Sequence, residues 1–139
     1  MKEHREITKW MDQTQWDFFV TITFDKKFND PHILHIMEDI ESHYLIKGIC
    51  WFREFTTTGL PHVHMVIHSD KIYKSFQKLP KVLKRYGQID FQLFKSSQGT
   101  KGLDYISKMW GKDDNLIWNI KTPKESNAKR KSKKRTSSN

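Results

Sequence analysis

The chain lacks the residues that several common kinds of protein site require. Its 139 residues include one cysteine, Cys50, which lies in an apolar run. A single thiol makes neither an intramolecular disulfide nor a cysteine-based zinc site, so a disulfide scaffold and a zinc finger are excluded. No apolar run approaches the roughly 20 residues that cross a bilayer, and residues 1–6 lack the apolar centre of a signal peptide. We therefore expect an intracellular protein with no membrane partner.

Charge is distributed unevenly along the chain. The net charge is +9, but residues 121–139 contain eight basic residues and one acidic residue, whereas residues 1–120 contain 17 basic and 15 acidic residues. A basic tail attracts phosphate backbones without reading their sequence. A solvated terminus, or a nuclear-import signal in a eukaryotic host, would have the same composition. The sequence thus predicts one domain over 1–120 and a basic, disordered tail over 121–139.

Periodicity within residues 1–120 predicts an α+β fold. Asn29, Asp30 and Pro31 form a helix start, because a capping residue precedes a proline in the first turn. Alternating and apolar runs predict strands, and apolar residues at helical spacing predict helices. The order indicates a central antiparallel sheet of about five strands with flanking helices and a ferredoxin-like or RNA-recognition-like βαββαβ core. The expected strands are 18–24, 49–55, 61–68 and 88–95, and 116–118 is a short extra element. The first helix is expected to begin at 29–31, the second after a cap at Ser69 or Asp70, and the third at 103.

The buried stripes of the helices are also predicted. The first helix should bury Ile33, Ile36, Met37, Ile40 and Tyr44, which share one face. In the second helix, Pro80 should cause a kink or a restart. The stripe expected there consists of Ile72, Phe76, Leu79 and Leu83.

The segment 59–67 contains two histidines separated by one apolar residue. Side chains alternate along a strand, so His62 and His64 project from the same face, about 7 Å apart. Glu54 ends the preceding strand, and its carboxylate reaches the same point if the two strands are antiparallel neighbours. Two nitrogens and one oxygen suit a divalent cation that keeps open positions for water or substrate. Two histidines at this spacing also occur on exposed strand faces that bind nothing.

Neighbouring polar residues are open to more than one interpretation. His68 lies on the face of His62 and His64, as a further ligand or a solvated strand end. Thr21 and Thr23 are expected on a half-exposed sheet surface. Arg53 alternates away from Glu54, where it forms a salt bridge or contacts nucleic acid.

The third predicted helix contains Tyr105 and Lys108. At a spacing of three, both side chains point from one side of the helix. A phenol has an ordinary pKa of about 10. It becomes a useful nucleophile when a cation stabilises the phenolate or when a metal polarises the phosphodiester that it attacks. Lys108 would then neutralise developing charge. A tyrosine near a lysine is also common on an amphipathic surface.

Taken in order, three blocks resemble the motifs of the HUH endonuclease superfamily. Residues 18–24 are similar to its first motif, residues 61–66 to its His-hydrophobic-His metal motif, and Tyr105 with Lys108 to the Tyr-X-X-Lys motif of single-tyrosine replication initiators of rolling-circle plasmids and small single-stranded DNA viruses. The resemblance spans about residues 16–111. It implies that Glu54, His62 and His64 bind Mg²⁺ or Mn²⁺. It also implies that Tyr105 attacks single-stranded DNA, leaving a 3′ hydroxyl and a 5′-phosphotyrosyl link.

Two features depart from the viral initiators of that family. The chain contains no Gly-X-X-X-X-Gly-Lys-Ser/Thr loop, so a separate helicase and a host polymerase would complete replication. Two tyrosines have a lysine three positions later, Tyr44 and Tyr105, but only Tyr105 follows the His-hydrophobic-His segment in the order of the motifs. Termination with this single tyrosine would need a second subunit, such as that of a homodimer, or sequential turnover. The location would be the cytoplasm of a prokaryotic host or the nucleus for a eukaryotic virus.

Two alternatives remain at the level of sequence. A single-tyrosine transposase of the same superfamily pairs the same motifs, and genomic context would separate it from an initiator. A non-catalytic RNA-recognition-like module has the same βαββαβ order and stacks bases on exposed sheet aromatics, here Phe19 or Phe52.

Overall fold

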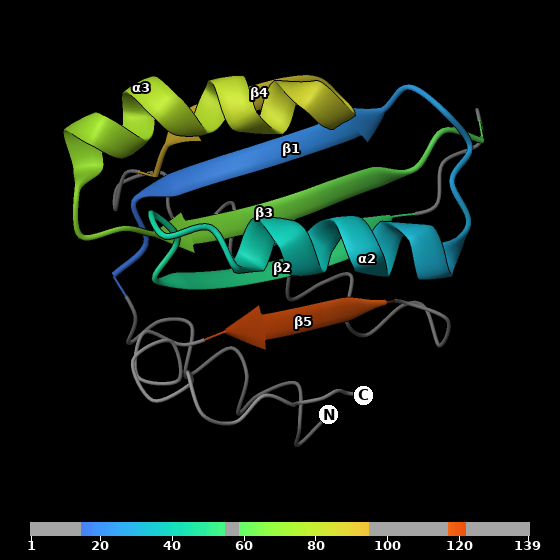
Figure 1. Ribbon diagram of the computed structural model, residues 1–139, viewed down its shortest axis with the longest axis horizontal. Coiled ribbons are helices and arrows are strands. Elements are labelled where there is room, and N and C mark those ends of the chain that lie inside the picture. The colour runs from blue at the N-terminus through green and yellow to red at the C-terminus, as the bar shows by residue number, and fades with distance from the viewer. Residues whose placement is uncertain (1–14, 55–58, 95–116, 122–139) are drawn as a thin grey trace.

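The computed structural model describes residues 15–54, 59–94 and 117–121. These residues form a five-stranded antiparallel sheet with two helices packed on one face (Figure 1). The predicted α+β class and the βαββαβ order are both confirmed. In chain order the elements are β1 (Phe18–Phe24), α2 (Asp30–Glu41), β2 (Gly48–Glu54), β3 (His62–His68), α3 (Ile72–Leu83), the 3-10 helix η1 (Lys84–Tyr86), β4 (Gly87–Leu93) and β5 (Trp118–Lys121).

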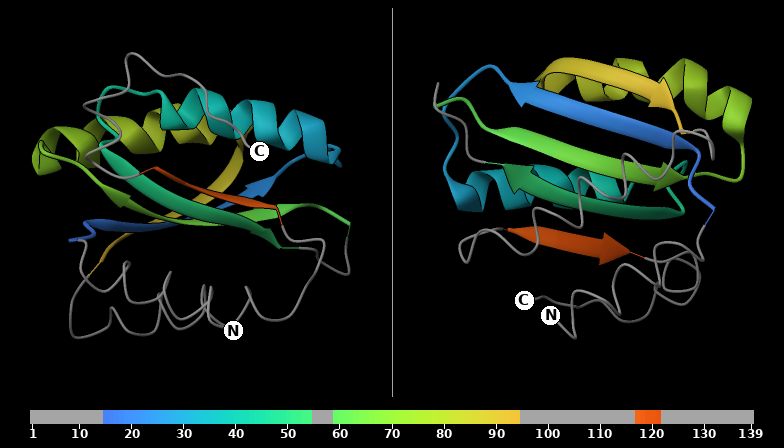
Figure 2. Two further views of the ribbon diagram at one scale, coloured as in Figure 1. Left: turned by 90° about the horizontal axis from the view of Figure 1, so that it is seen from below. Right: turned by 180° about the vertical axis from the view of Figure 1, so that it is seen from behind.

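The sheet order is β4-β1-β3-β2-β5, and every neighbouring pair is antiparallel. β1 and β3 are therefore central and adjacent, although α2 and β2 separate them in the sequence. This arrangement follows from the two helical connections, which each return the chain across the same face of the sheet (Figure 2). β2 is not an edge strand, because β5 pairs with its outer side, and this agrees with its nearly continuous apolar sequence.

The core lies between the sheet and the two helices. Alternate residues of β1 (Phe18, Val20, Ile22, Phe24) are fully buried under the helices, as the period-two pattern requires. α2 buries Ile33, Ile36, Met37 and Ile40 against them, as predicted. Its start is also as predicted, since the Asn29 side chain accepts a hydrogen bond of 3.0 Å from the backbone N–H of His32.

Three details of the predicted helices are wrong. α2 ends at Glu41, so Tyr44 lies beyond it and is 54% exposed. In α3, Leu79 and Leu83 are buried, but Ile72 and Phe76 at the start of the stripe are exposed, because this end of the helix extends past the sheet core. Of the two outcomes expected at Pro80, the restart is wrong, because α3 continues through Pro80 to Leu83. Among the described residues, no helix has the length and apolar character needed to cross a membrane.

β5 ties the end of the described chain to the C-terminal end of α2. The carboxylate of Glu41 accepts hydrogen bonds from Trp51 Nε1 (2.6 Å) and from Asn119 Nδ2 (3.0 Å). Lys121 Nζ donates to the backbone carbonyls of Glu41 and Ile46. Lys121, assigned to the tail by its charge, is therefore part of the sheet. Residues 122–139 lie outside the described residues.

Candidate metal centre

Strand register brings the three predicted ligands together on the sheet face that α2 and α3 leave uncovered. His62 in β3 pairs directly with Glu54 in β2, and both side chains point to that face. His64 follows two residues later on the same face. The ligand atoms of Glu54, His62 and His64 all lie within 4.8 Å of one another, so the three residues could hold a metal ion. The sequence prediction that β2 and β3 are antiparallel neighbours is confirmed.

Glu54 reaches across the strand pair diagonally. Its register partner is His62, but its carboxylate Oε1 lies 2.7 Å from Nε2 of His64. Diagonal neighbours on one face of an antiparallel pair are within reach of long side chains, and glutamate has the length that the contact needs. The carboxylate is 26% exposed, whereas the imidazole of His64 is 10% exposed. The cluster is therefore partly covered by protein and open on the Glu54 side.

His64 is held in a form that suits metal binding. Burial lowers the pKa of His64 below its ordinary value, and the charge of Glu54 and the hydrogen bond that its carboxylate accepts oppose this effect only in part. The ring packs beside Phe52, with centroids 5.1 Å apart, and lies 6.4 Å from the ring of His62. A neutral imidazole carries a single ring proton, so binding of a cation at Nε2 would require only that this proton reside on Nδ1, beside Thr21.

Thr21 in β1 completes the surroundings of His64. The two residues are register partners, and Thr21 Oγ1 lies 3.1 Å from Nδ1 of the imidazole. His64 is thus held at both ring nitrogens, by Thr21 on one side and Glu54 on the other. Sequence reasoning placed Thr21 on a generic sheet surface and missed this contact. The sequence indicates that Thr21 points to the same face of β1 as Phe19. It does not indicate that this face meets His64, because that requires knowing that β1 pairs with β3.

The donor set defines what the cluster can do chemically. Two imidazole nitrogens and one carboxylate oxygen suit borderline or hard divalent cations such as Mn²⁺ or Mg²⁺, and they leave coordination positions for water or phosphate oxygens. Metal–nitrogen and metal–oxygen bonds of about 2.1 Å require small side-chain rotations from the described positions. Such a cation would act as a Lewis acid toward an oxygen of a bound phosphodiester.

His68 does not join the cluster, although it shares the face of His62 and His64. Its Nδ1 lies 2.9 Å from Asp17 Oδ2, and its Nε2 lies 3.6 Å from Asp70 Oδ1. The same Asp17 oxygen accepts a hydrogen bond of 2.8 Å from the backbone N–H of Ser69. His68 therefore links the start of β1 to the turn before α3, at the opposite end of β3 from Glu54.

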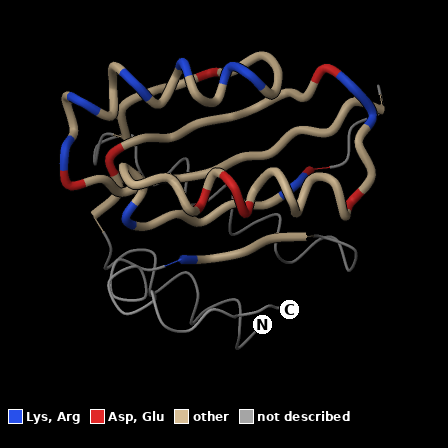
Figure 3. Tube along the Cα trace, in the orientation of Figure 1, with Lys and Arg blue, Asp and Glu red and all other residues tan. Residues whose placement is uncertain are grey.

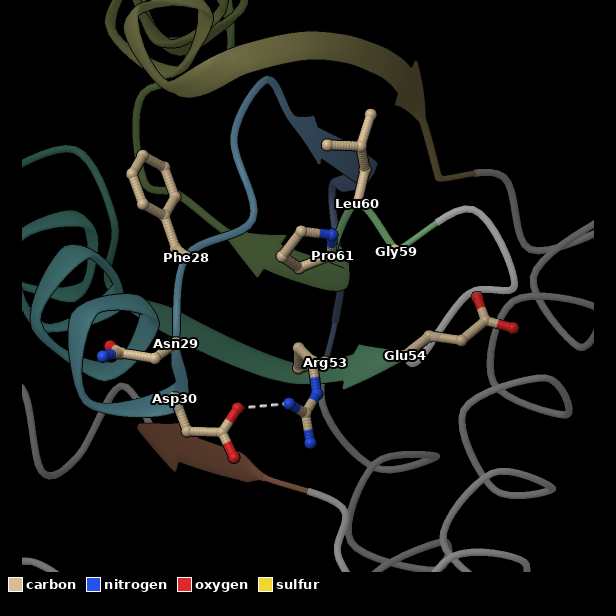
Figure 4. Close-up of a pocket in the computed structure, with 8 residues that line it drawn as sticks. All are labelled: Phe28, Asn29, Asp30, Arg53, Glu54, Gly59, Leu60 and Pro61. Atoms are coloured by element: carbon tan, nitrogen blue, oxygen red, sulfur yellow. Dashed lines mark hydrogen bonds and ion pairs between the residues drawn. The ribbon is translucent and has the colours of Figure 1, made fainter.

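A hollow of about 330 Å³ lies beside the cluster (Figure 4). Phe28, Leu60 and Pro61 line it, and Arg53 and Asp30 form an ion pair within it. Arg53 and Glu54 point to different sides of β2, as their alternation predicts. The predicted salt bridge of Arg53 is confirmed. Glu54 also borders the hollow, but its side chain points away from Arg53 and Asp30, so the hollow and the cluster lie on different sides of β2.

The aromatic residues proposed for base stacking differ in accessibility. Phe52 is fully buried beside His64, so stacking of a base on Phe52 is excluded. Phe19 is half-buried on the same face. An RNA-recognition-like module would stack bases on both rings, but only Phe19 is accessible. This weakens the alternative that the protein is a non-catalytic RNA-recognition-like module.

Tyr105 and Lys108, together with the helix predicted to carry them, lie outside the described residues. Comparisons of the chain with models of protein families, with curated proteins and with solved structures found no match. The resemblance to HUH endonucleases thus remains a prediction that rests on the residues of this chain.

Proposed function

We propose that this protein is a metal-dependent endonuclease and strand transferase that acts on single-stranded DNA. The observation that carries the proposal is the convergence of Glu54, His62 and His64 on one face of a βαββαβ sheet. Thr21 is hydrogen-bonded to Nδ1 of His64, the ring nitrogen that faces away from Glu54. A pair of exposed strand histidines that binds nothing would need neither the carboxylate of Glu54 nor a buried imidazole with a hydrogen-bond partner at each ring nitrogen.

The reaction follows from the residues in their proposed roles. The three ligands would hold Mg²⁺ or Mn²⁺, which supplies charge to polarise the scissile phosphodiester. The hydroxyl oxygen of Tyr105 attacks phosphorus, the bond from phosphorus to the 3′ oxygen breaks, and the phenolic proton is transferred by way of solvent to that oxygen. The products are a 3′ hydroxyl and a 5′-phosphotyrosyl link, and Lys108 neutralises charge on the phosphate. Attack by another 3′ hydroxyl reverses the step and joins the strands.

Initiation of rolling-circle replication is the biological role that we propose for this chemistry, with a separate helicase and host polymerase. A single-tyrosine transposase would use the same residues for the same reaction. The two roles differ in substrate rather than in mechanism. Nicking confined to one origin-like hairpin supports initiation, whereas excision and joining of two ends supports transposition.

The decisive experiment incubates the full chain with a library of single-stranded oligonucleotides and Mn²⁺. We expect a covalent protein–DNA adduct that survives denaturation. It should not form when EDTA is present, and it should be absent in Tyr105→Phe. Tyr73→Phe is the matched control, because Tyr73 is 88% exposed and belongs to α3, on the face of the sheet away from the cluster. Binding without any adduct, unaffected by EDTA, would instead identify a non-catalytic nucleic-acid-binding module.

A further inference from the structure

α3 carries a straight row of lysines on its exposed side. Lys71, Lys74, Lys78 and Lys81 recur at alternating spacings of three and four residues, which places them along one line of a helix. All four are exposed, and we call them the lysine stripe. Lys84 and Arg85 in η1 continue the positive charge beyond the helix. At 1.5 Å per residue, the stripe is about 15 Å long.

Positive charge is concentrated in the segment that carries the stripe, and the rest of the described chain is not basic. Residues 71–86 contain six cations and no carboxylate. The other described residues contain five cations and nine carboxylates, a net charge of −4. In Figure 3 the blue positions recur along α3, whereas red positions interrupt α2. Because like charges repel within this segment and no carboxylate in it relieves them, the arrangement favours an anionic partner.

One contact and one electrostatic effect relate the stripe to the segment that follows α2. Lys74 Nζ lies 5.4 Å from the centre of the Tyr44 ring, which follows the C-terminal end of α2. The nearby His43 has a lowered pKa, because it is partly buried and because Lys78 and Arg85 place positive charge close to it. The stripe therefore acts at the surface of the helical layer, on the opposite side of the sheet from Glu54, His62 and His64 (Figures 2 and 3).

We propose that the lysine stripe binds the phosphate backbone of duplex DNA, at a surface separate from the candidate metal centre. The choice of DNA rests on the proposed function, in which the substrate strand continues into a paired segment. A duplex suits the stripe because it presents a rigid phosphate row of high charge density. Single-stranded DNA binding relies on bases stacked along a row of aromatic side chains. The exposed aromatic residues near the stripe, Tyr44 and Tyr73, both lie next to Lys74 and do not form a row along it.

A membrane surface fits the stripe less well than a duplex. Membrane-binding helices insert a continuous apolar face between lipid headgroups. In α3, Leu79 and Leu83 are buried in the core, and the exposed Phe76 packs against Phe18 and Phe91 with ring centroids 6.4 and 6.1 Å apart. The exposed apolar and aromatic side chains of α3, Ile72, Tyr73 and Phe76, are confined to its N-terminal end, so no continuous apolar face runs along the helix.

The test compares two double substitutions of equal charge in the full chain. Lys78→Gln with Lys81→Gln neutralises the stripe, and Lys26→Gln with Lys47→Gln removes two cations elsewhere. Binding to a blunt duplex is measured by fluorescence anisotropy over a series of salt concentrations. Each lost phosphate contact lowers the slope of log affinity against log salt by about 0.9. We expect the magnitude of this slope to decrease by roughly 2 in the stripe variant, which loses two contacts, and to stay at the wild-type value in the control variant.

Several outcomes would overturn the inference. Equal losses in the two variants would mean that only net charge matters, and no loss in either would mean that the stripe touches no phosphate. A loss restricted to a single-stranded probe, or to vesicles containing phosphatidylserine, would assign the stripe to a different partner. If wild-type protein forms no adduct but the two slopes still differ as expected, the proposed cleavage fails while the duplex-binding surface stands.

Discussion

Thr21 Oγ1 and His64 Nδ1 lie 3.1 Å apart across the central strand pair β1–β3. The other ring nitrogen of His64 faces Glu54 at 2.7 Å. Without a cation, the Nε2–H donates to the carboxylate and Nδ1 accepts from the Thr21 hydroxyl. With a cation at Nε2, the proton resides on Nδ1 and donates to the same hydroxyl. A hydroxyl serves both states, because it is a donor and an acceptor. Thr21 is therefore a positioning residue for His64.

Replacing Thr21 by valine should weaken metal binding without unfolding the protein. Valine keeps the shape of threonine but cannot accept the Nδ1–H, and loss of such a partner commonly costs about 10–100-fold in affinity. We expect Mn²⁺ affinity, measured by calorimetry, to fall by this factor in Thr21→Val and to recover in Thr21→Ser.

Thr23 provides the matched control for this prediction. It lies on the same strand and face, it is the register partner of His62, and no hydrogen bond joins the two side chains in the described part of the chain. Thr23→Val should therefore bind Mn²⁺ as tightly as the wild type. Equal losses in Thr21→Val and Thr23→Val would show that strand packing, not the hydroxyl, determines the affinity.

The two histidines should respond differently to alanine substitution. Each removes a ligand, so Mn²⁺ affinity should fall by more than about 100-fold in both variants, beyond the effect of an outer partner. His62 is half-buried, whereas His64 is buried between Thr21 and Phe52. We expect His62→Ala to change the free energy of unfolding by less than about 0.5 kcal/mol. His64→Ala should lower it by about 1–3 kcal/mol, measured by urea denaturation with EDTA present.

From the sequence alone we expect both histidines to be partly exposed and both alanine variants to keep the fold largely intact. The burial of His64, which is 8% exposed, corrects the first of these expectations. His62→Ala is the cleaner probe of metal binding, because its fold is unchanged. If His62→Ala binds Mn²⁺ as tightly as the wild type, the proposal that Glu54, His62 and His64 hold a metal ion is wrong.

His68 should be irrelevant to the metal and relevant to stability. Its ring bridges Asp17 and Asp70 at the far end of β3, away from Glu54. We expect His68→Gln to leave Mn²⁺ affinity unchanged and to lower the free energy of unfolding by about 0.5–1.5 kcal/mol, the usual worth of one hydrogen bond. Weaker Mn²⁺ binding in this variant, at unchanged stability, would place His68 in the centre.

Gly87 is required where η1 passes into β4. A Cβ added there would lie 2.1 Å from the backbone oxygen of Thr23, and backbone cannot move aside as a flexible side chain can. We expect Gly87→Ala to lower the free energy of unfolding by on the order of 3 kcal/mol, measured by thermal and urea denaturation.

Gly59 is the comparison for that substitution. Its φ is +90°, but a Cβ there would meet only the movable end of Lys27. Gly59→Ala should therefore cost about 1 kcal/mol, from backbone conformation alone. A Gly87→Ala variant as stable as Gly59→Ala would show that β4 can shift away from β1.

Much of the fold could be predicted from the sequence because its determinants are local. Alternation of buried residues in 18–24 and the Asn29 cap require only neighbours in the chain. Errors arose at Tyr44, which lies beyond the end of α2, and at Phe76, which stays half exposed near the start of α3. Periodicity reports which residues share a face, but not where a helix ends or how fully each residue is covered.

The sequence alone determined the chemistry of the candidate site: two imidazoles at strand spacing, with a carboxylate at the end of the preceding strand. Only the tertiary structure decided which contacts hold them. The pairing of β1 with β3 brings Thr21 to His64 across 43 positions of chain, and the diagonal reach of Glu54 joins it to His64 rather than only to its register partner His62. Such contacts depend on sheet order and register, which arise from the packing of the whole sheet against α2 and α3, and no short segment encodes them.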